Sequence, residues 1–388
     1  MEKIKIGVVG AGAVGCTVAA LLAKAGYDVE LAKIYKSQFN LTNNVALTIS
    51  GEFGDHNVLV NTCKGIDKFS SLKDFIFIFS RANDAKKSSS IALKYLTPNG
   101  KIVTLQNVFT LDVVLEVVPR DKLLGLIIGW SPIKNDYNNI SILSNGINVI
   151  GPFCPNLDSS LILLKQVLSN ITPTYITNNL VGLAISRLII NSAISSLGCI
   201  TGARLGNLME IKNVKKLFEG LFKEDMAIAK ARGIKITPYC KEFDYYELMK
   251  PGFASFLQRR RKLSQLGRQN PYVVSSTLRN IENNKQTEID YTIGYFIKQG
   301  KKLNIKTPLN SRLYEMISDI ENHEIGIFPD NAMDYYLRKP HKYINKEIDY
   351  VNWWNKKSKC WSNEKQRCKF KEYLFSINKQ TLASNNKC

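Results

Sequence analysis

Hydrophobic residues in the first half of the chain fall into short runs that alternate with segments of helical spacing. Short apolar runs bounded by turn-forming residues are typical of buried strands, and apolar residues three and four positions apart predict helices. Because strands and helices alternate, their order predicts an α/β fold with a doubly wound parallel sheet. The predicted strands are Ile4–Val9, Tyr27–Leu31, Phe75–Phe79, Lys101–Leu105 and Leu124–Ile128, and the predicted helices are Val14–Ala25, Ser88–Leu96 and Thr110–Val118.

The pattern changes after the last of these strands. The apolar segments Ile140–Leu143 and Asn148–Ile150 flank Ser144-Asn145-Gly146, which predicts a hairpin that completes the sheet edge. A helix over Ser159–Leu168 is expected to close this first domain. Beyond residue 178 only helical spacing remains, which predicts an all-α domain with helices that include Leu180–Ile200, Val214–Arg232 and Glu288–Lys302.

We therefore expect three segments: an α/β domain over residues 1–175, an all-α domain over 176–324 and an extension over 325–388. The extension is rich in lysine and contains Trp353, Trp354 and Trp361. Because disordered tails are poor in aromatic residues, we expect parts of it to pack against the body of the protein. Contact with RNA or a membrane surface is the alternative that its basic and aromatic composition leaves open.

A glycine-rich turn follows the first predicted strand. Gly10, Gly12 and Gly15 have the G-x-G-x-x-G spacing, in which the glycines permit a tight turn, close approach of a pyrophosphate and close packing of helix on strand. The following helix offers unpaired N–H groups and the positive end of its dipole to the phosphates. The motif, between a strand and a helix, predicts a Rossmann-type domain whose dinucleotide contacts Gly10, Ala11, Gly12, Ala13, Val14 and Gly15.

Residues around the end of the second predicted strand indicate which dinucleotide is bound. Enzymes that use NAD place an acidic side chain there to bind the ribose 2′-hydroxyl. Glu30 lies one position too early for this role and is expected to point away from the site. Lys33 and Lys36 stand where cations would bind a 2′-phosphate, so the sequence favours NADP(H).

Composition and charge favour a globular protein whose surface attracts anionic ligands. The chain has 388 residues with 45% hydrophobic and 22% charged residues, which is typical of a globular protein large enough for two cores. The formal net charge of +20 is spread along the chain, with concentrations at Arg259–Lys262 and beyond residue 338. A spread charge favours a surface that attracts an anionic cofactor and substrate over a dedicated nucleic-acid site.

Location and assembly follow from the cysteines and the apolar segments. The eight cysteines form no C-x-x-C pair, which predicts a reducing, cytoplasmic compartment and no metal site. The first predicted strand begins at Ile4, so no secretory leader is expected. The apolar run Val181–Ala203 includes Arg187 and Asn191, which favours a buried core helix over a membrane span. The oligomeric state stays open, a homodimer being one option.

Polar residues on the predicted helix 180–200 form a second candidate site. Arg187, Asn191 and Ser195 are spaced by four residues and share one face. Either they are satisfied across a domain interface, or they line a substrate cleft. Further along, Ser275-Ser276 precedes a short helical turn, and Thr287 is expected to cap a helix whose first turn contains Glu288 and Asp290.

Taken together, these motifs resemble those of the ketopantoate reductases (2-dehydropantoate 2-reductases). The resemblance covers roughly residues 3–320 and rests on Gly-Ala-Gly-Ala-Val-Gly near the N-terminus, Thr104-Leu-Gln106-Asn107, Ser275-Ser276-Thr-Leu-Arg-Asn-Ile, Thr287-Glu288-Ile-Asp290-Tyr-Thr-Ile-Gly294, Gly300 and Thr307-Pro308-Leu-Asn310. It implies a reductase of pantothenate biosynthesis that transfers hydride from NADPH to the ketone of a 2-oxo acid. Asn107 would lie beside nicotinamide and substrate, while Asn191, Ser195, Ser276 and Glu288 would belong to the substrate site.

Four positions depart from the family pattern. Arg187 stands where the family has the lysine that acts as general acid, and a guanidinium keeps its proton in proteins. Ser195 replaces a second asparagine, Arg81 replaces a lysine of the cofactor site, and Val108 replaces a glycine. The first hypothesis is therefore a reductase with Arg187 as the catalytic residue and an altered substrate. The second is a catalytically silent nucleotide-binding protein whose basic tail binds a macromolecule.

Overall fold

The computed structural model describes residues 3–33, 43–104, 113–153, 159–211, 213–237, 244–269 and 271–332. Several residues of the sequence interpretation lie outside these ranges. They are Lys36, Asn107, Val108, the tryptophans at 353, 354 and 361, and the first three residues of the predicted helix over Thr110–Val118.

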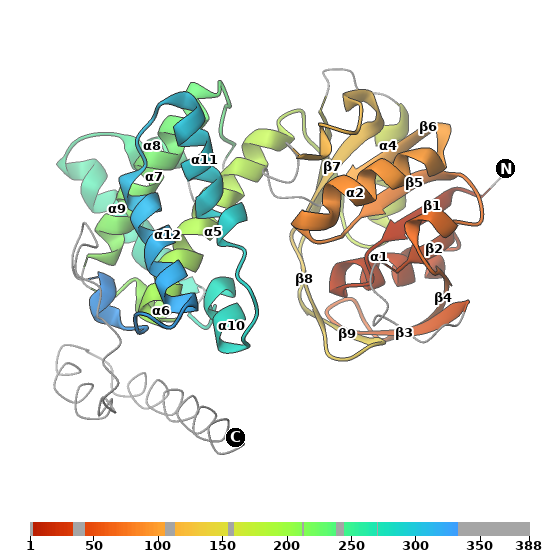
Figure 1. Ribbon diagram of the computed structural model, residues 1–388, viewed down its shortest axis with the longest axis horizontal. Helices are drawn as coiled ribbons and strands as arrows, with labels where there is room; N and C mark the ends of the chain where they lie inside the picture. The colour runs from red at the N-terminus through yellow and green to blue at the C-terminus, as the bar shows by residue number, and fades with distance from the viewer. Residues whose placement is uncertain are drawn as a thin grey trace, which may run out of the picture. The chain divides into compact units, whose positions relative to one another are not determined.

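An 11-stranded sheet, counted over the described residues, forms the N-terminal region (Figure 1). Its order is β11-β10-β7-β6-β5-β1-β2-β4-β3-β9-β8. Neighbours from β7 to β4 pair in parallel, as the sequence predicts, whereas β10 with β7, β3 with β4 and β8 with β9 pair antiparallel. The strands are β1 (Lys5–Val9), β2 (Asp28–Ala32), β3 (Asn44–Gly51), β4 (His56–Cys63), β5 (Lys73–Ile78), β6 (Leu96–Thr104), β7 (Leu123–Ile128), β8 (Ser131–Lys134), β9 (Asn139–Ser144), β10 (Asn148–Pro152) and β11 (Thr174–Ile176).

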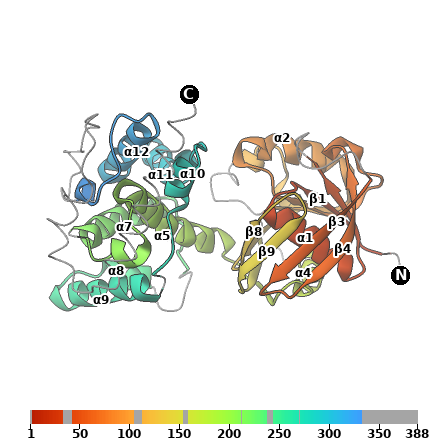
Figure 2. The same cartoon turned by 90° about the horizontal axis from the view of Figure 1, so that it is seen from below.

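Helices cover both faces of the sheet, which confirms the doubly wound arrangement (Figures 1 and 2). Along β5, Phe75 and Phe77 pack in the core beneath α1 and α4, whereas Ile76 and Ile78 pack on the opposite face with α2. The helix predicted over Ser88–Leu96 begins six residues earlier, and Leu96 already belongs to β6. These helices are α1 (Ala13–Lys24), α2 (Ala82–Ala92) and α4 (Ser159–Ser169).

The predicted hairpin over residues 140–150 is wrong. β9 pairs with β3 and β8 at one end of the sheet, whereas β10 pairs with β7 and β11 near the other end. The turn residues between them do not reverse the chain onto itself, because Ile147 and Asn148 are held beside β7. The carbonyl of Ile147 accepts a hydrogen bond from the Gly129 amide at 2.8 Å.

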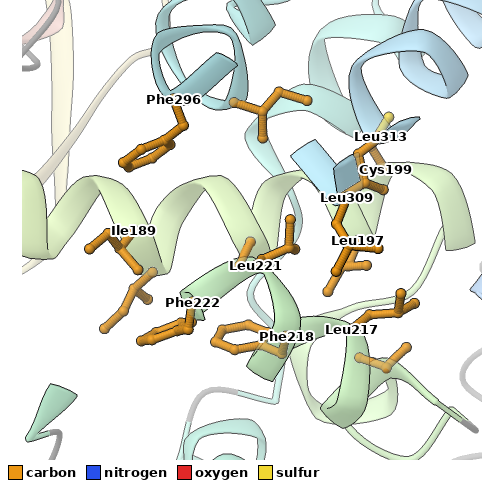
Figure 3. Close-up of a cluster of buried hydrophobic side chains, with 14 of the residues drawn as sticks. Ile189, Leu197, Cys199, Leu217, Phe218, Leu221, Phe222, Phe296, Leu309 and Leu313 are labelled. Atoms are coloured by element: carbon orange, nitrogen blue, oxygen red, sulfur yellow. The ribbon is translucent and has the colours of Figure 1, made fainter. Parts of the chain in front are cut away.

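The C-terminal region is built around α5 (Leu180–Thr201), a long apolar helix whose side chains are mostly buried. Figure 3 shows Ile189 and Leu197 of α5 facing Phe218 and Leu221 of α7. By length and composition α5 could cross a membrane, but it packs here as a core helix. The remaining helices are α6 (Leu205–Leu208), α7 (Val214–Ala231), α8 (Tyr245–Met249), α9 (Phe253–Gln269), α10 (Ser276–Glu282), α11 (Ile293–Leu303) and α12 (Pro308–Glu321).

The continuous helix predicted over Glu288–Lys302 is interrupted. Residues Ile289–Tyr291 form a 3-10 turn, and α11 begins only at Ile293. Thr292, with φ −109° and ψ −98°, lies between them and is the N-cap of α11, so the prediction of Thr287 as the cap is wrong. The Thr287 amide instead donates to Glu321 Oε1 at 3.0 Å, which ties this segment to the end of α12.

Residues after α12 also pack on α5. The carbonyl of Ile200, in the last turn of α5, accepts hydrogen bonds from the Phe328 amide at 3.1 Å and from Asn331 Nδ2 at 2.8 Å. Ile325 and Ala332 are buried in the same core. Residues 325–332 therefore contribute to the packing of the helix that carries the second candidate site.

A buried acid lies between α7 and α12. Asn310 Nδ2 donates to Asp225 Oδ1 at 2.9 Å and to Glu224 Oε2 at 2.9 Å. In the described part of the chain, Asp225 Oδ2 and Asn310 Oδ1 are both buried without a hydrogen-bond partner. Burial raises the pKa of Asp225 well above its ordinary value. A proton on Asp225 would supply the donor that Asn310 Oδ1 lacks.

We expect Asp225→Asn to make the protein more stable at alkaline pH. Because the folded-state pKa of Asp225 is raised, its stabilising contribution is complete below the unfolded pKa and is lost as pH rises through the folded pKa. The amide cannot ionise, so the variant should escape this loss. Asp225→Ala should instead cost about 1–3 kcal/mol, since the buried Asn310 amide loses one of its two acceptors and keeps only Glu224.

The measurement is urea unfolding of each variant between acidic and alkaline pH. Asp67→Asn, at an exposed carboxylate, is the matched control and should leave the pH dependence unchanged. An Asp225→Asn variant with the same pH dependence as the wild type would contradict the assignment of a protonated acid.

Candidate functional site

Two glycines of the turn after β1 are required by the backbone. Gly10 has φ +108°, and a Cβ there would lie 2.7 Å from the carbonyl oxygen of Phe79. A Cβ on Gly15 would overlap the carbonyl oxygen of Gly10. Only glycine therefore allows the turn to approach β5 and α1 to pack against the turn. This confirms the local geometry that the sequence motif predicts.

Gly12 differs from these two glycines because the fold does not require it. It is the N-cap of α1, with ordinary φ −80° and ψ −175°, and no atom of the described residues lies within 4 Å of a Cβ placed on it. Gly12 is exposed, no side chain caps the helix, and the first turn of α1 contains no acidic residue. The turn thus leaves space and N–H groups for an anion, which is the fit that a dinucleotide pyrophosphate needs.

Three paired strands bring the other cofactor candidates to the same edge. Val9, Ala32 and Ile78 are neighbours across β1, β2 and β5. The glycine-rich turn, Lys33 and Arg81 follow these residues closely in sequence. Arg81 is exposed at the N-cap of α2. The candidate positions on three separate segments therefore gather at the carboxyl ends of three parallel strands.

Glu30 does not serve this edge. Its carboxylate forms an ion pair with Lys73 at 2.8 Å and accepts hydrogen bonds from the amide and hydroxyl of Ser70, both at 3.0 Å. Both members of the pair are buried, so Glu30 is committed to the fold, in agreement with the expectation that it points away. A buried pair of this kind is costly to break from one side.

Lys33 begins the segment after β2 and is only 7% exposed. Its amide donates to the carbonyl of Cys63 at 3.2 Å, which fixes its place beside β4. Burial, and secondarily the charge of Lys64, lower the pKa of the Lys33 ammonium. Both effects disfavour its positive charge, so an arriving anion would relieve them.

The second candidate site is built on α5. Arg187, Asn191 and Ser195 lie along this helix as the spacing predicts; Arg187 is half-buried and Asn191 is exposed. Arg187 Nη1 donates to the carbonyl oxygen of Ile128, the last residue of β7, at 2.7 Å. This bond ties α5 to the sheet and fixes one side of the guanidinium.

Two serines far apart in sequence meet beside α5. The hydroxyl oxygens of Ser195 and Ser276 lie 3.2 Å apart. Ser275 secures this approach, because its hydroxyl donates to the carbonyl of Ser195 at 2.6 Å and accepts from the Leu278 amide at 3.1 Å as the N-cap of α10. The structure therefore joins the motif around residue 275 to the polar face of α5. Ser276 itself is exposed, as a substrate-binding group must be.

The acidic residues of the next motif have separate environments. Glu288 is exposed at the start of the 3-10 turn. Asp290 accepts a hydrogen bond from the Tyr314 hydroxyl at 2.6 Å, an interaction that raises the pKa of Tyr314 to about 12. Asp290 thus braces α12, whereas Glu288 remains available to a ligand. Within the described ranges, no group of three His, Cys, Asp or Glu side chains has the arrangement of a metal site.

One residue near the glycine-rich turn is not among the site residues that the sequence predicts. Lys134, the last residue of β8, donates from Nζ to the carbonyl oxygen of Ala11 at 2.9 Å. The sequence places Lys134 more than a hundred positions away from the motif, and no periodicity marks residues 131–134 as a strand. The pairing of β8 with β9 and the packing of β8 on α1 bring this lysine to the turn.

Comparisons with known proteins agree with this arrangement. The family model described as ketopantoate reductase PanE/ApbA matches residues 6–155, and the model of the C-terminal domain of the same family matches residues 179–321. The chain is 25% identical over 331 residues to the 2-dehydropantoate 2-reductase of Pyrococcus horikoshii, covering 82% of this chain and 98% of the relative. It is 23% identical over 326 residues to that of Aquifex aeolicus, covering 81% and 96%.

Solved structures show the same fold. A PanE/ApbA family ketopantoate reductase from Ralstonia eutropha JMP134 superimposes with a TM-score of 0.68 at 22% identity, covering 82% of this chain and 99% of that one. D-mandelate dehydrogenase in complex with NADH and anilino(oxo)acetate gives a TM-score of 0.69 at 16% identity, with the same coverage. With two family models that together span both regions of the fold, the chain belongs to the ketopantoate reductase family of oxidoreductases.

Proposed function

We propose that this protein is an NADPH-dependent reductase of a 2-oxo acid. The observation that carries the proposal is the turn at Gly12, which opens onto the uncapped N-terminus of α1. Relatives over four-fifths of the chain are 2-dehydropantoate 2-reductases, which favours a 2-oxo acid as substrate and a place in pantothenate biosynthesis. The altered residues at 187 and 195 favour a substrate that differs from ketopantoate in the groups that these side chains contact.

The chain's own residues would bind the substrate carboxylate and polarise its ketone. The reduced nicotinamide supplies the hydride when the cofactor is bound. Arg187, held by the Ile128 carbonyl, carries a guanidinium, a group that can bind a carboxylate or polarise a ketone. Ser276 and Asn191 are exposed polar groups that can donate to the substrate oxygens. Because a guanidinium does not release its proton, water would protonate the alkoxide that forms.

NADPH is favoured over NADH by the residues around β2. Glu30 is bound to Lys73 and Ser70, so it is unavailable to a ribose 2′-hydroxyl. Lys33 follows β2 directly, and Lys64 is close enough for its charge to lower the Lys33 pKa, so both cations can contribute to the field that attracts a 2′-phosphate. Lys36 lies outside the described residues, and its role as a second phosphate ligand stays a prediction.

Lys33→Met should weaken NADPH binding without changing NADH binding. Loss of one charge-assisted hydrogen bond to the 2′-phosphate corresponds to a dissociation constant about tenfold higher. Titration of nicotinamide fluorescence with both cofactors measures the two constants. Lys24→Met, at an exposed lysine in the last turn of α1, is the control and should change neither. Equal losses for NADPH and NADH would contradict the assignment of Lys33 to the 2′-phosphate.

Oxidation of NADPH at 340 nm in the presence of a panel of 2-oxo acids tests the function itself, with ketopantoate as the reference substrate. Turnover with any member of the panel supports the proposal. Tight binding of NADPH without turnover favours a silent nucleotide-binding protein. Absence of affinity for both NADPH and NADH overturns the proposal.

A further inference from the structure

The helix α9 concentrates positive charge that is otherwise spread along the chain. It contains five cationic residues and no acidic residue in 17 positions. Figures 1 and 2 both show α9 at the outer side of the helical region, away from the sheet. The cations that stand together at 259–262 in the sequence therefore belong to a basic helix at the surface of the fold.

One side of α9 is committed to the fold. Leu263 is buried in the helical core, and a Cβ on Gly267 would lie 3.1 Å from the carbonyl oxygen of Leu205 in α6. Arg259 is paired with Glu219 of α7 at 3.6 Å. The helix cannot turn this side outward, so its opposite, exposed side is what a partner would meet.

Three arginines on the exposed side have no acidic partner. Within the described ranges, the guanidinium groups of Arg260, Arg261 and Arg268 form neither a hydrogen bond nor an ion pair. The Arg260 guanidinium lies over the ring of Phe256, 5.0 Å from its centroid. Each of these cations is therefore available to an external anion, which would also relieve their mutual repulsion.

An aromatic ring lies at the start of the same helix. Phe253, the first residue of α9, is 76% exposed, and its ring stacks on that of Phe256 with 6.4 Å between the centroids. Since Arg260 lies over Phe256, two rings and a guanidinium follow one another. Most of the Phe253 side chain remains uncovered, and an unpaired base is a planar group that can stack there.

Polar residues between the arginines indicate the class of partner. Gln258, Arg261, Gln265 and Arg268 are exposed and spaced by three or four residues, so they share one face. Arginine binds phosphates, and side-chain amides can hydrogen-bond the 2′-hydroxyls of RNA.

A lipid surface fits this helix less well. An interfacial helix needs a continuous apolar face toward the lipid. On α9 the large exposed apolar side chains, Phe253 and Leu257, lie in the first two turns. The remaining exposed positions are polar or cationic, which favours a phosphate backbone over acyl chains.

We propose that the exposed side of α9 binds single-stranded RNA, with phosphates on Arg260, Arg261 and Arg268 and an unpaired base stacked on Phe253. This activity goes beyond the proposed reductase. It is independent of that function, because α9 contributes no residue to the cofactor edge or to the polar face of α5.

Fluorescence anisotropy of a labelled oligouridylate measures binding to the full-length protein over a series of salt concentrations. Arg261→Gln/Arg268→Gln removes two charges from the exposed side but keeps polar side chains, and Phe253→Ala removes the ring. Lys24→Met/Lys68→Met, at two exposed lysines of the N-terminal region, removes the same net charge and is the matched control. Thermal unfolding verifies that each variant keeps its fold.

We expect Phe253→Ala to raise the dissociation constant about tenfold, the effect of one stacked base. The double arginine variant should also bind more weakly, and the slope of log Kd against log salt should fall by about 1.4, or about 0.7 for each lost phosphate contact. The lysine control should bind as the wild type does, since salt screens distant charges. Duplex RNA and an oligodeoxyuridylate should bind more weakly than the RNA strand, and ultraviolet crosslinks should map to residues 253–268.

Four results would overturn the inference. Wild-type affinity in both α9 variants would assign the RNA to another surface, and an equal loss in the lysine control would reduce the effect to net charge. Equal affinity for the duplex or the DNA strand would contradict the assignment to single-stranded RNA. Binding to vesicles of phosphatidylcholine and phosphatidylserine without binding to RNA would assign α9 to a membrane surface. The reductase proposal would stand in each case, because NADPH and 2-oxo acids test it separately.

Discussion

Gly12→Val is expected to abolish dinucleotide binding while leaving the protein folded. The backbone at Gly12 is in an ordinary extended conformation, and a Cβ placed there has no atom of the described part of the chain within 4 Å. A valine would instead fill the space in front of the α1 N–H groups. Losing two charge-assisted hydrogen bonds to the pyrophosphate costs about 3–6 kcal/mol, which raises the dissociation constant for NADPH by about a hundredfold or more.

Isothermal titration with NADPH and thermal unfolding, measured on the same samples, separate binding from folding. Gly15→Val is the matched comparison, because its side chain would overlap the Gly10 carbonyl and should lower the unfolding temperature. If Gly12→Val bound NADPH as tightly as the wild type, the pyrophosphate would not lie at this turn, and the proposed function would lose its main support.

Arg187→Lys is expected to raise kcat for ketopantoate by about a hundredfold, the lower end of the range for general acid catalysis. A lysine ammonium can give up its proton near neutral pH when burial lowers its pKa, whereas a guanidinium cannot. Position 187 is half-buried against the Ile128 carbonyl, so a lysine there would experience this effect. Steady-state kinetics across pH should show a new alkaline limb, since the rate falls when the lysine loses its proton.

Arg187→Gln is the control for this substitution. It keeps a donor for Ile128 but has neither a charge nor a transferable proton, so it should lower kcat for every 2-oxo acid that the wild type reduces. If Arg187→Lys reduced ketopantoate no faster than the wild type, the arginine would not be what limits ketopantoate reduction. Substrate contacts such as Ser195 and Ser276 would then become the next positions to vary.

The parallel centre of the fold could be predicted from the sequence because both faces of its strands are buried. β1, β5 and β7 contain continuous apolar runs for that reason, and glycine spacing locates the turn after β1. β3 and β4 are not identified, since they form an antiparallel pair in which buried and exposed residues largely alternate along each strand. Polar residues such as Asn57 and Asn61 lie between their apolar residues, so neither strand contains a continuous apolar run that would predict it.

The candidate site was predictable where it depends on helical spacing or a local motif. Four-residue spacing places Arg187, Asn191 and Ser195 on one helix. The serine pair at 275–276 indicates the start of a helical turn, and Ser275 is the N-cap of α10. The 3.2 Å approach of Ser195 to Ser276 depends on packing between α5 and α10, which neither segment encodes alone. Lys134 was missed for the same reason, because its neighbour Ala11 is 123 residues away.

The order of the strands also affects how this protein folds during its synthesis on the ribosome. One edge of β3 pairs with β9, whose Ser141 hydroxyl meets that of Ser50 across 91 positions of sequence. Such distant pairings raise contact order and slow folding. As the polypeptide leaves the ribosome, β3 and β4 emerge long before β9 does, so an unpaired strand edge stays exposed throughout that interval. This edge is where we expect nascent chains to need protection by chaperones.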